Sequence, residues 1–143
     1  MKLYKVDGKF KLKKSEEPTE EPAESEKYSV DDCICEIVAY NGSLQVSHWK
    51  ADTITNQHKA LGDLYDSMIG LIDTFTETYI GKYGMIKLSI CELEDLGNTP
   101  VAKGLEYVKK LQSNCKTGED DDLLNIVADM STALYKAKYL LKE

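Results

Sequence analysis

The sequence predicts an all-α protein, a four-helix bundle preceded by a short tail. Two observations support this. After Tyr28 apolar residues recur at helical spacing through most of the chain, and four such stretches are bounded by helix start and stop signals. Before Tyr28 the composition is different and helical spacing is absent. We therefore expect two parts, a tail over residues 1–27 and a helical bundle over residues 28–143.

The tail itself divides in two. Residues 1–14 alternate apolar and polar residues around Asp7-Gly8, a dipeptide typical of two-residue β-hairpin turns. Residues 15–26 carry six glutamates and two prolines, which indicates a solvated linker. A lone hairpin is marginally stable in water, so we expect an N-terminal hairpin or extended segment that either docks on a larger assembly or fluctuates.

The first two predicted helices contain most of the chemically interesting residues. One spans about residues 30–51, with Ser29 as N-cap, and the next spans about residues 57–81 and stops at Gly81 and Gly84. The Asn41-Gly42-Ser43 stretch weakens the middle of the first helix. The apolar stripe of the first helix is Val30, Ile34, Ile37, Leu44 and His48, and that of the second is Leu61, Leu64, Tyr65, Met68, Ile72, Phe75 and Tyr79.

Three further helical segments are expected after Gly84. A short one covers Met85 to Leu96, between the second and third main helices. Thr99 then caps the third helix, with Pro100 at its first position, and this helix runs to about Asn114. An acidic loop over residues 116–122 leads into the last helix, whose expected inner face is Leu123, Leu124, Ile126, Val127, Met130, Leu134, Tyr135 and Leu140.

Composition limits the function classes. The net charge is −7 and lysine supplies every basic residue, because the chain has no arginine. The lack of arginine argues against sequence-specific DNA recognition and leaves open non-specific contact between lysines and phosphates. No apolar run is long enough to span a membrane and no signal peptide is visible, so we expect a cytoplasmic protein. The four cysteines lack metal-site spacing, and we expect free thiols rather than a disulfide or zinc site.

One polar line on the second helix is the candidate site. At about 100° per residue, His58, Asp66, Asp73 and Glu77 fall on one arc beside the apolar stripe, and His48 lies near the end of the first helix. Imidazole and carboxylate groups in such register predict a metal site. Because the arc is off-centre, the site needs cover from outside its own bundle.

These residues resemble the motif of the Dps-like miniferritins, a branch of the ferritin-like superfamily. His48-Trp49 matches the family's His-Trp pair, His58 its second histidine, and Asp73 with Glu77 its Asp-x-x-x-Glu element. The Leu64-Tyr65 pair also matches. One departure is Gly62, where the family usually has an aspartate. The resemblance covers about residues 30–143.

The resemblance implies a ferritin-like bundle that oxidises Fe(II) with peroxide or oxygen and stores iron in a hollow homo-oligomer, a dodecamer. It further implies a di-iron site shared between subunits, with His48 and His58 from one chain and Asp73 and Glu77 from its neighbour. Asp66 is an outer candidate ligand. The ligand set also suits zinc or manganese.

A second function class stays open from the sequence. A ferritin-like bundle without catalysis could serve as a structural or assembly protein that docks through residues 1–14. A virus particle is one such setting, since phages carry relatives of this kind. The Gly62 departure favours this alternative, whereas the register of two histidines and two acids favours iron chemistry.

Overall fold

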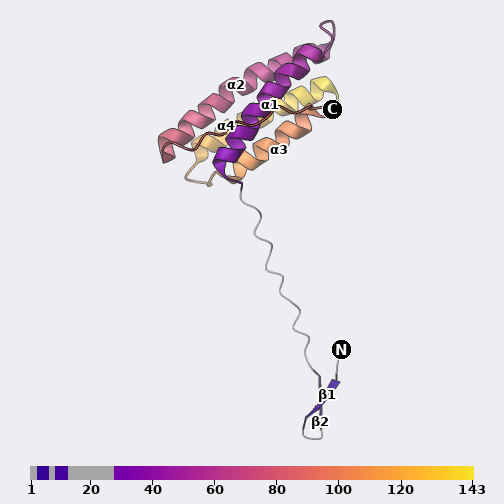
Figure 1. Cartoon of the computed structure of the whole chain (residues 1–143), viewed down its shortest axis with the longest axis vertical. Coiled ribbons are helices and arrows are strands. Elements are labelled where there is room, and N and C mark those ends of the chain that lie inside the picture. Colours follow the sequence, from indigo (N-terminus) through magenta and orange to yellow (C-terminus); the bar gives the residue numbers. More distant parts are fainter. Residues whose placement is uncertain (1–2, 7–8, 13–27) are drawn as a thin grey trace.

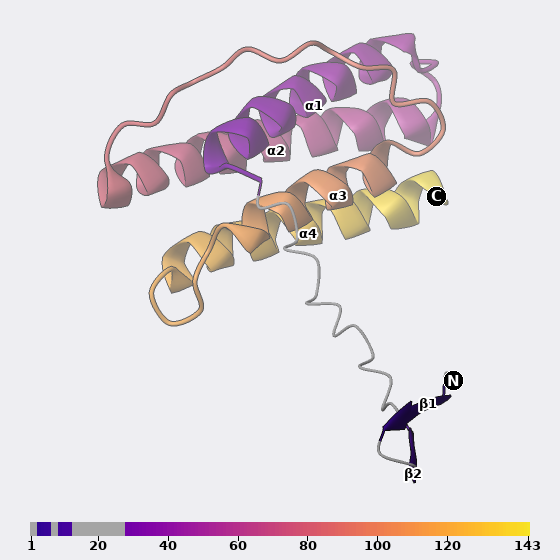
Figure 2. The same ribbon diagram turned by 60° about the horizontal axis from the view of Figure 1, so that its bottom comes forward.

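A computed structural model describes residues 3–6, 9–12 and 28–143 of the chain. Its four helices are α1 (Val30–Lys50), α2 (Asn56–Tyr83), α3 (Pro100–Ser113) and α4 (Asp121–Leu141). Helices α1 and α4 each pack against both α2 and α3, so the four axes form a square with α1 and α4 on one diagonal (Figures 1 and 2). The predicted four-helix bundle is confirmed.

In the N-terminal segment two short strands pair with each other. Strands β1 (Leu3–Val6) and β2 (Lys9–Leu12) are antiparallel, with Val6 opposite Lys9. The predicted turn at residues 7–8 and the predicted linker lie outside the described residues. The docking role expected for residues 1–14 therefore stays a prediction.

The apolar stripes of the helices meet in one core. The stripes of α1 and α2 are buried as predicted, except that His48, Tyr65 and Tyr79 are only partly buried. The expected face of α4 is partly wrong, because Tyr135 and Leu140 are 59% and 42% exposed and Ala137 is buried instead. No helix in the described part of the chain is long and apolar enough to cross a membrane. The most deeply buried side chains include Tyr40, Leu44, Leu61, Met68, Phe75, Leu111, Leu123, Met130 and Leu134.

The cap of α1 is the predicted one, whereas the cap of α3 comes from a residue far along the chain. The Ser29 side chain accepts a hydrogen bond from the Asp32 amide at 3.2 Å, so the predicted cap of α1 is confirmed. Thr99 makes no side-chain cap on α3, contrary to expectation. The Glu143 carboxylate takes that place, accepting from the amides of Val101 at 2.9 Å and Ala102 at 2.8 Å. A carboxylate at a helix N-terminus also complements the helix dipole.

The connection from α2 to α3 is the main correction to the predicted fold. Residues 84–99 contain no helix; they form an extended crossover that runs the length of the bundle along its outside (Figure 2). The short helix expected over Met85 to Leu96 is therefore wrong. The crossover returns the chain to the end where α2 began, so α3 runs parallel to α2.

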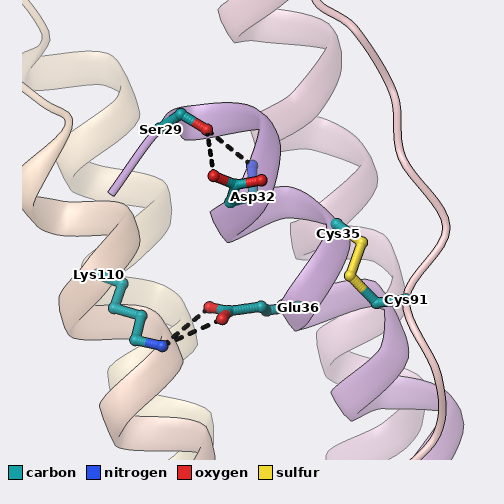
Figure 3. Close-up of a disulfide and its surroundings, with 6 residues drawn as sticks. All are labelled: Ser29, Asp32, Cys35, Glu36, Cys91 and Lys110. Atoms are coloured by element: carbon teal, nitrogen blue, oxygen red, sulfur yellow. Dashed lines mark hydrogen bonds and ion pairs between the residues drawn. A yellow bond between two sulfur atoms is a disulfide. The ribbon is translucent and has the colours of Figure 1, made fainter. Parts of the chain in front are cut away.

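A disulfide joins this crossover to α1. Cys35 and Cys91 are bonded, with their Cα atoms 5.5 Å apart (Figure 3). The expectation of four free thiols is wrong for this pair and right for Cys33 and Cys115. An extended segment can place Cys91 beside α1, whereas the predicted helix gave no reason for that approach. Cys33 is free although Cys35 is bonded, because residues two apart on a helix face different directions.

Where α2 ends and the crossover begins, a buried aspartate ties α2 to the α3–α4 loop. Asp120 is 1% exposed; it accepts from the Tyr83 hydroxyl, from the Lys116 amide at 2.9 Å and from the Lys82 ammonium at 3.0 Å. The hydrogen bond from Tyr83, then that from Lys116, lowers the pKa of Asp120 to about 2. This cluster fixes the position where α2 ends.

Candidate functional site: a histidine pair at the turn between α1 and α2

The turn between α1 and α2 brings the two histidines together. His48 lies in the last turn of α1 and His58 in the first turn of α2. Thr55 caps α2 by accepting from the His58 amide at 3.4 Å, and its own hydroxyl donates to the Asp52 carbonyl at 2.7 Å. The two imidazole rings lie with their centroids 3.9 Å apart and their planes 31° from parallel.

Reciprocal hydrogen bonds set the tautomer of both rings. His48 Nδ1 lies 2.8 Å from the His58 carbonyl, and His58 Nδ1 lies 3.0 Å from the His48 carbonyl. A carbonyl oxygen can only accept, so each Nδ1 carries the proton and donates it. In the neutral ring Nε2 is then the unprotonated nitrogen. An Nδ1–H bonded to a backbone carbonyl, with Nε2 as the lone-pair donor, is the usual state of a metal-binding histidine.

Gly62 is what allows His48 to lie across α2. A Cβ atom at this position would sit 2.8 Å from His48 Cε1 and 3.0 Å from its Nδ1. Real side chains do not approach so closely, so any other residue here would displace the imidazole. The glycine at position 62 thus has a local structural reason.

A polar hollow of about 310 Å³ opens beside His48. Trp49 and Gln45 contribute to it from α1, and Lys59, Asp63 and Asp66 from α2. Lys59 pairs with Asp63 at 2.7 Å, which neutralises that carboxylate. Asp66 has no ion pair within the described part of the chain. Of the acids in the hollow, Asp66 is therefore the one available to a cation.

Asp73 and Glu77 lie elsewhere. Both are exposed on α2, and fifteen residues of helix rise put Asp73 about 22 Å beyond His58 along its axis. Within the described residues of one chain, no three His, Cys, Asp or Glu side chains cluster to hold a metal ion. The two histidines are brought together, and Asp66 lines the hollow beside His48, but the Asp73/Glu77 pair is not brought to them.

The interior of the bundle offers no alternative metal centre. Among the described residues, the buried polar side chains are Asn41, Ser43 and Asp120. Two of these are neutral, and Asp120 is held by Tyr83, Lys116 and Lys82. Di-iron centres built inside a helical bundle need several inward glutamates and histidines. A metal site built from residues 28–143 would therefore use side chains on the surface of the bundle.

Sequence reasoning missed part of this site. The spacing of the histidines suggested ligands, but nothing in the sequence indicated that Gly62 lies under the His48 ring, because residues 48 and 62 belong to different helices. Gln45 and Lys59, which lie on the same helices as His48 and Asp63, were missed as well. Their one available signal is helical spacing from His48 and from Asp63, which is common on any polar helix face.

Comparisons with known proteins give one match. The model of a family of unknown function (DUF5856) covers residues 48–141, which include all five candidate ligands. No curated protein matches the chain. No solved structure matches it either. Because the match extends over more than half of the sequence, the chain belongs to the DUF5856 family.

Proposed function

We propose that this protein binds Fe(II) at a seam between two copies of the chain and oxidises it, as a miniferritin-like iron-storage protein. His48 and His58 would bind the iron from one chain, and Asp73 and Glu77 from its neighbour, with Asp66 as an outer ligand. Fe(II) is the substrate here, oxidised by peroxide or oxygen and stored inside a homo-oligomer.

The histidine pair carries this proposal. In each of the two neighbouring imidazoles Nδ1–H donates to a backbone carbonyl, so the Nε2 lone pair is available to another partner. Donors fixed in this way lose little freedom on binding a metal. The exposure of Asp73 and Glu77 supports the second half of the proposal, because exposed acids on the same helix can reach a neighbouring chain.

The connectivity of the helices and the charge of the bundle agree with the proposal. A single long crossover between the second and third helices is the ferritin-like way of linking four helices. Residues 1–27 contain seven lysines and seven acidic residues, so the net charge of −7 belongs entirely to residues 28–143. An acidic surface concentrates cations such as Fe(II) and repels the phosphates of DNA.

The chain's own residues would position the iron and balance its charge. The two carboxylates would offset the charge of Fe(II) and favour the more highly charged Fe(III) further, and the two imidazoles would bind through their Nε2 lone pairs. Asp66 and the Lys59–Asp63 pair would control the charge at the mouth of the hollow. Imidazole with carboxylate also accommodates zinc or manganese, so metal content of the purified protein identifies the natural ion.

Fe(II) oxidation by single variants tests the proposal. We expect His58→Ala and Glu77→Ala each to oxidise Fe(II) at least about tenfold more slowly than wild type, because each loses a ligand. Asp129→Asn removes an exposed acid on α4 and is the matched control, expected to oxidise at the wild-type rate. Equal rates in all four proteins would refute the proposed site.

A different function is favoured by the exposed apolar side chains. Met85, Leu88, Ile90 and Leu93 on the crossover are each more than half exposed, as is Trp49 at the end of α1. Exposed apolar groups that follow one another along a segment are typical of a surface that contacts another protein. A structural or assembly protein, such as a virion component that docks through residues 1–14, would need this surface and no metal.

Particle mass separates the two functions. A closed shell of identical chains in solution, measured by light scattering, is what iron storage requires. A monomer that assembles only with another protein is what an assembly role requires, and it would rule out the storage proposal.

A further inference from the structure

We propose that the Cys35–Cys91 disulfide is a reversible redox clip. When oxidised it fastens the first half of the crossover, residues 84–91, to α1, and when reduced it releases this half. The two halves of the crossover are attached differently, one sulfur of the bond is accessible, and the other two cysteines are free thiols. The clip does not depend on the iron chemistry proposed above.

The two halves of the crossover are attached in different ways. In the second half the Glu94 amide donates to Ser43 Oγ at 2.9 Å, the Glu94 carboxylate accepts from the Tyr107 hydroxyl, and Leu96 is 3% exposed. In the first half, residues 85–90 make no hydrogen bond within the described part of the chain, and only Ile86 packs on the core. The disulfide is therefore the main attachment of the first half (Figure 3).

The bond is accessible from one side. Cys91 is partly exposed between two exposed neighbours, Ile90 and Glu92, whereas Cys35 is 5% exposed on α1. A thiolate of an external dithiol can attack Sγ of Cys91; the Cys35 sulfur leaves as a thiolate and takes up a proton. The second thiol of the reductant then displaces Cys91, so the protein gains two thiols and the dithiol becomes a disulfide. Glutathione disulfide reverses the process by the same exchange.

The remaining cysteines do not interfere with the clip. Cys33 is 1% exposed and faces Asn114 on the other side of α1. Burial raises the pKa of the Cys33 thiol to about 11, and burial does the same for Cys115. Both therefore stay protonated and unreactive near neutral pH. The clip has two states, closed and open, with no alternative pairing.

Opening the clip would leave the bundle folded and change one face of it. The buried core contains no residue from the stretch 85–93. Leu93, by contrast, lies against Gly42, which lines a groove of about 220 Å³ between α1 and α2 with Val38 and Asn41. Release of the first half would free the chain up to the edge of this groove, while Glu94 stays bonded to Ser43, so the redox state changes the shape of this face.

Trypsin cleavage of the full chain tests the clip, because Lys87 lies in the first half of the crossover. We expect cleavage after Lys87, mapped by mass spectrometry, to be at least about tenfold faster in reduced than in oxidised wild type, since cleavage requires a released segment. Cys91→Ser should be cleaved at the fast rate with or without dithiothreitol. Cys33→Ser, the matched control, should behave as wild type, and glutathione disulfide should restore the slow rate.

Three results would overturn the inference. One is equal cleavage after Lys87 in oxidised wild type and in Cys91→Ser. Another is a disulfide that stays closed in native protein across glutathione redox buffers, which would make it a permanent bond. The third is loss of helical circular dichroism in reduced wild type, because the bundle itself would then depend on the bond. If Cys91→Ser fails to fold, circular dichroism of reduced wild type still tests whether the bundle depends on the bond.

Discussion

Gly62 shows how one residue shapes the candidate site. The His48 ring lies where the Cβ of any other residue would be, and from there its Nδ1 donates to the His58 carbonyl. Gly70, two turns further along α2, has no atom within 4 Å of the position its Cβ would take. The two glycines stand in the same helix and differ only in what covers them, so they form a matched pair.

We expect Gly62→Ala and Gly70→Ala to have opposite effects on the free energy of unfolding. Alanine gains up to about 1 kcal/mol over glycine within a helix. At Gly62 the clash with His48 adds a cost of about 1–3 kcal/mol, so the net effect is a loss of about 1 kcal/mol. Urea unfolding followed by circular dichroism measures both changes. Stabilisation by both substitutions would show that His48 does not lie over Gly62.

At the scale of elements, polar anchors hold segments that hydrophobic patterns do not specify. Asp120 fixes the end of α2 to the α3–α4 loop, and Cys35 with Cys91 fixes the crossover to α1. Cross-linking residues 56 apart stabilises the folded state by about 4 kcal/mol in the chain-entropy account. That is a large share of the stability of a small domain.

The Asp120 cluster predicts a loss of stability in acid. Hydrogen bonds, first from Tyr83 and then from Lys116, lower the folded-state pKa of Asp120 from 3.8 to about 2. Its contribution is therefore complete above the unfolded pKa and is lost as pH falls from about 4 to about 2. We expect Asp120→Asn to be less stable than wild type at pH 6, with the difference shrinking by pH 2. A difference that stays constant with pH, measured by urea unfolding, would contradict this.

The sequence predicted the helices well and the crossover badly, for one physical reason. Helices α1 and α2 begin and end within two residues of expectation, because long apolar stripes and caps are local signals. The stretch Met85 to Leu96 mixes apolar and polar residues without a long period. Its shape is set by distant contacts, the disulfide to Cys35 and the hydrogen bond to Ser43, which no local pattern encodes.

The same limit applies to the site. Helical spacing placed the candidate acids on one face of α2, and all three are exposed there. The contact between His48 and His58 depends on the conformation of the turn between α1 and α2. The sequence indicated where this turn lies but not its conformation. Contact between the histidines and the Asp73/Glu77 pair stays a prediction, because it involves a second chain.

At the scale of the whole molecule, one chain alone does not bring the proposed ligands together. The histidine pair lies at one end of α2, and Asp73 and Glu77 lie about four and about five helical turns away. A two-fold axis across this face would place the acids of each chain near the histidines of the other. Two equivalent sites per pair of chains would follow, since a two-fold interface repeats every contact twice.

Complementation between two inactive variants tests this central claim most directly. His58→Ala lacks a histidine but keeps its acids, and Glu77→Ala lacks an acid but keeps its histidines. When the two are co-expressed and pair at random, half of the pairs are mixed and each mixed pair has one intact site. We therefore predict Fe(II) oxidation at about a quarter of the wild-type rate. No recovery above the separate variants would contradict a site shared between chains.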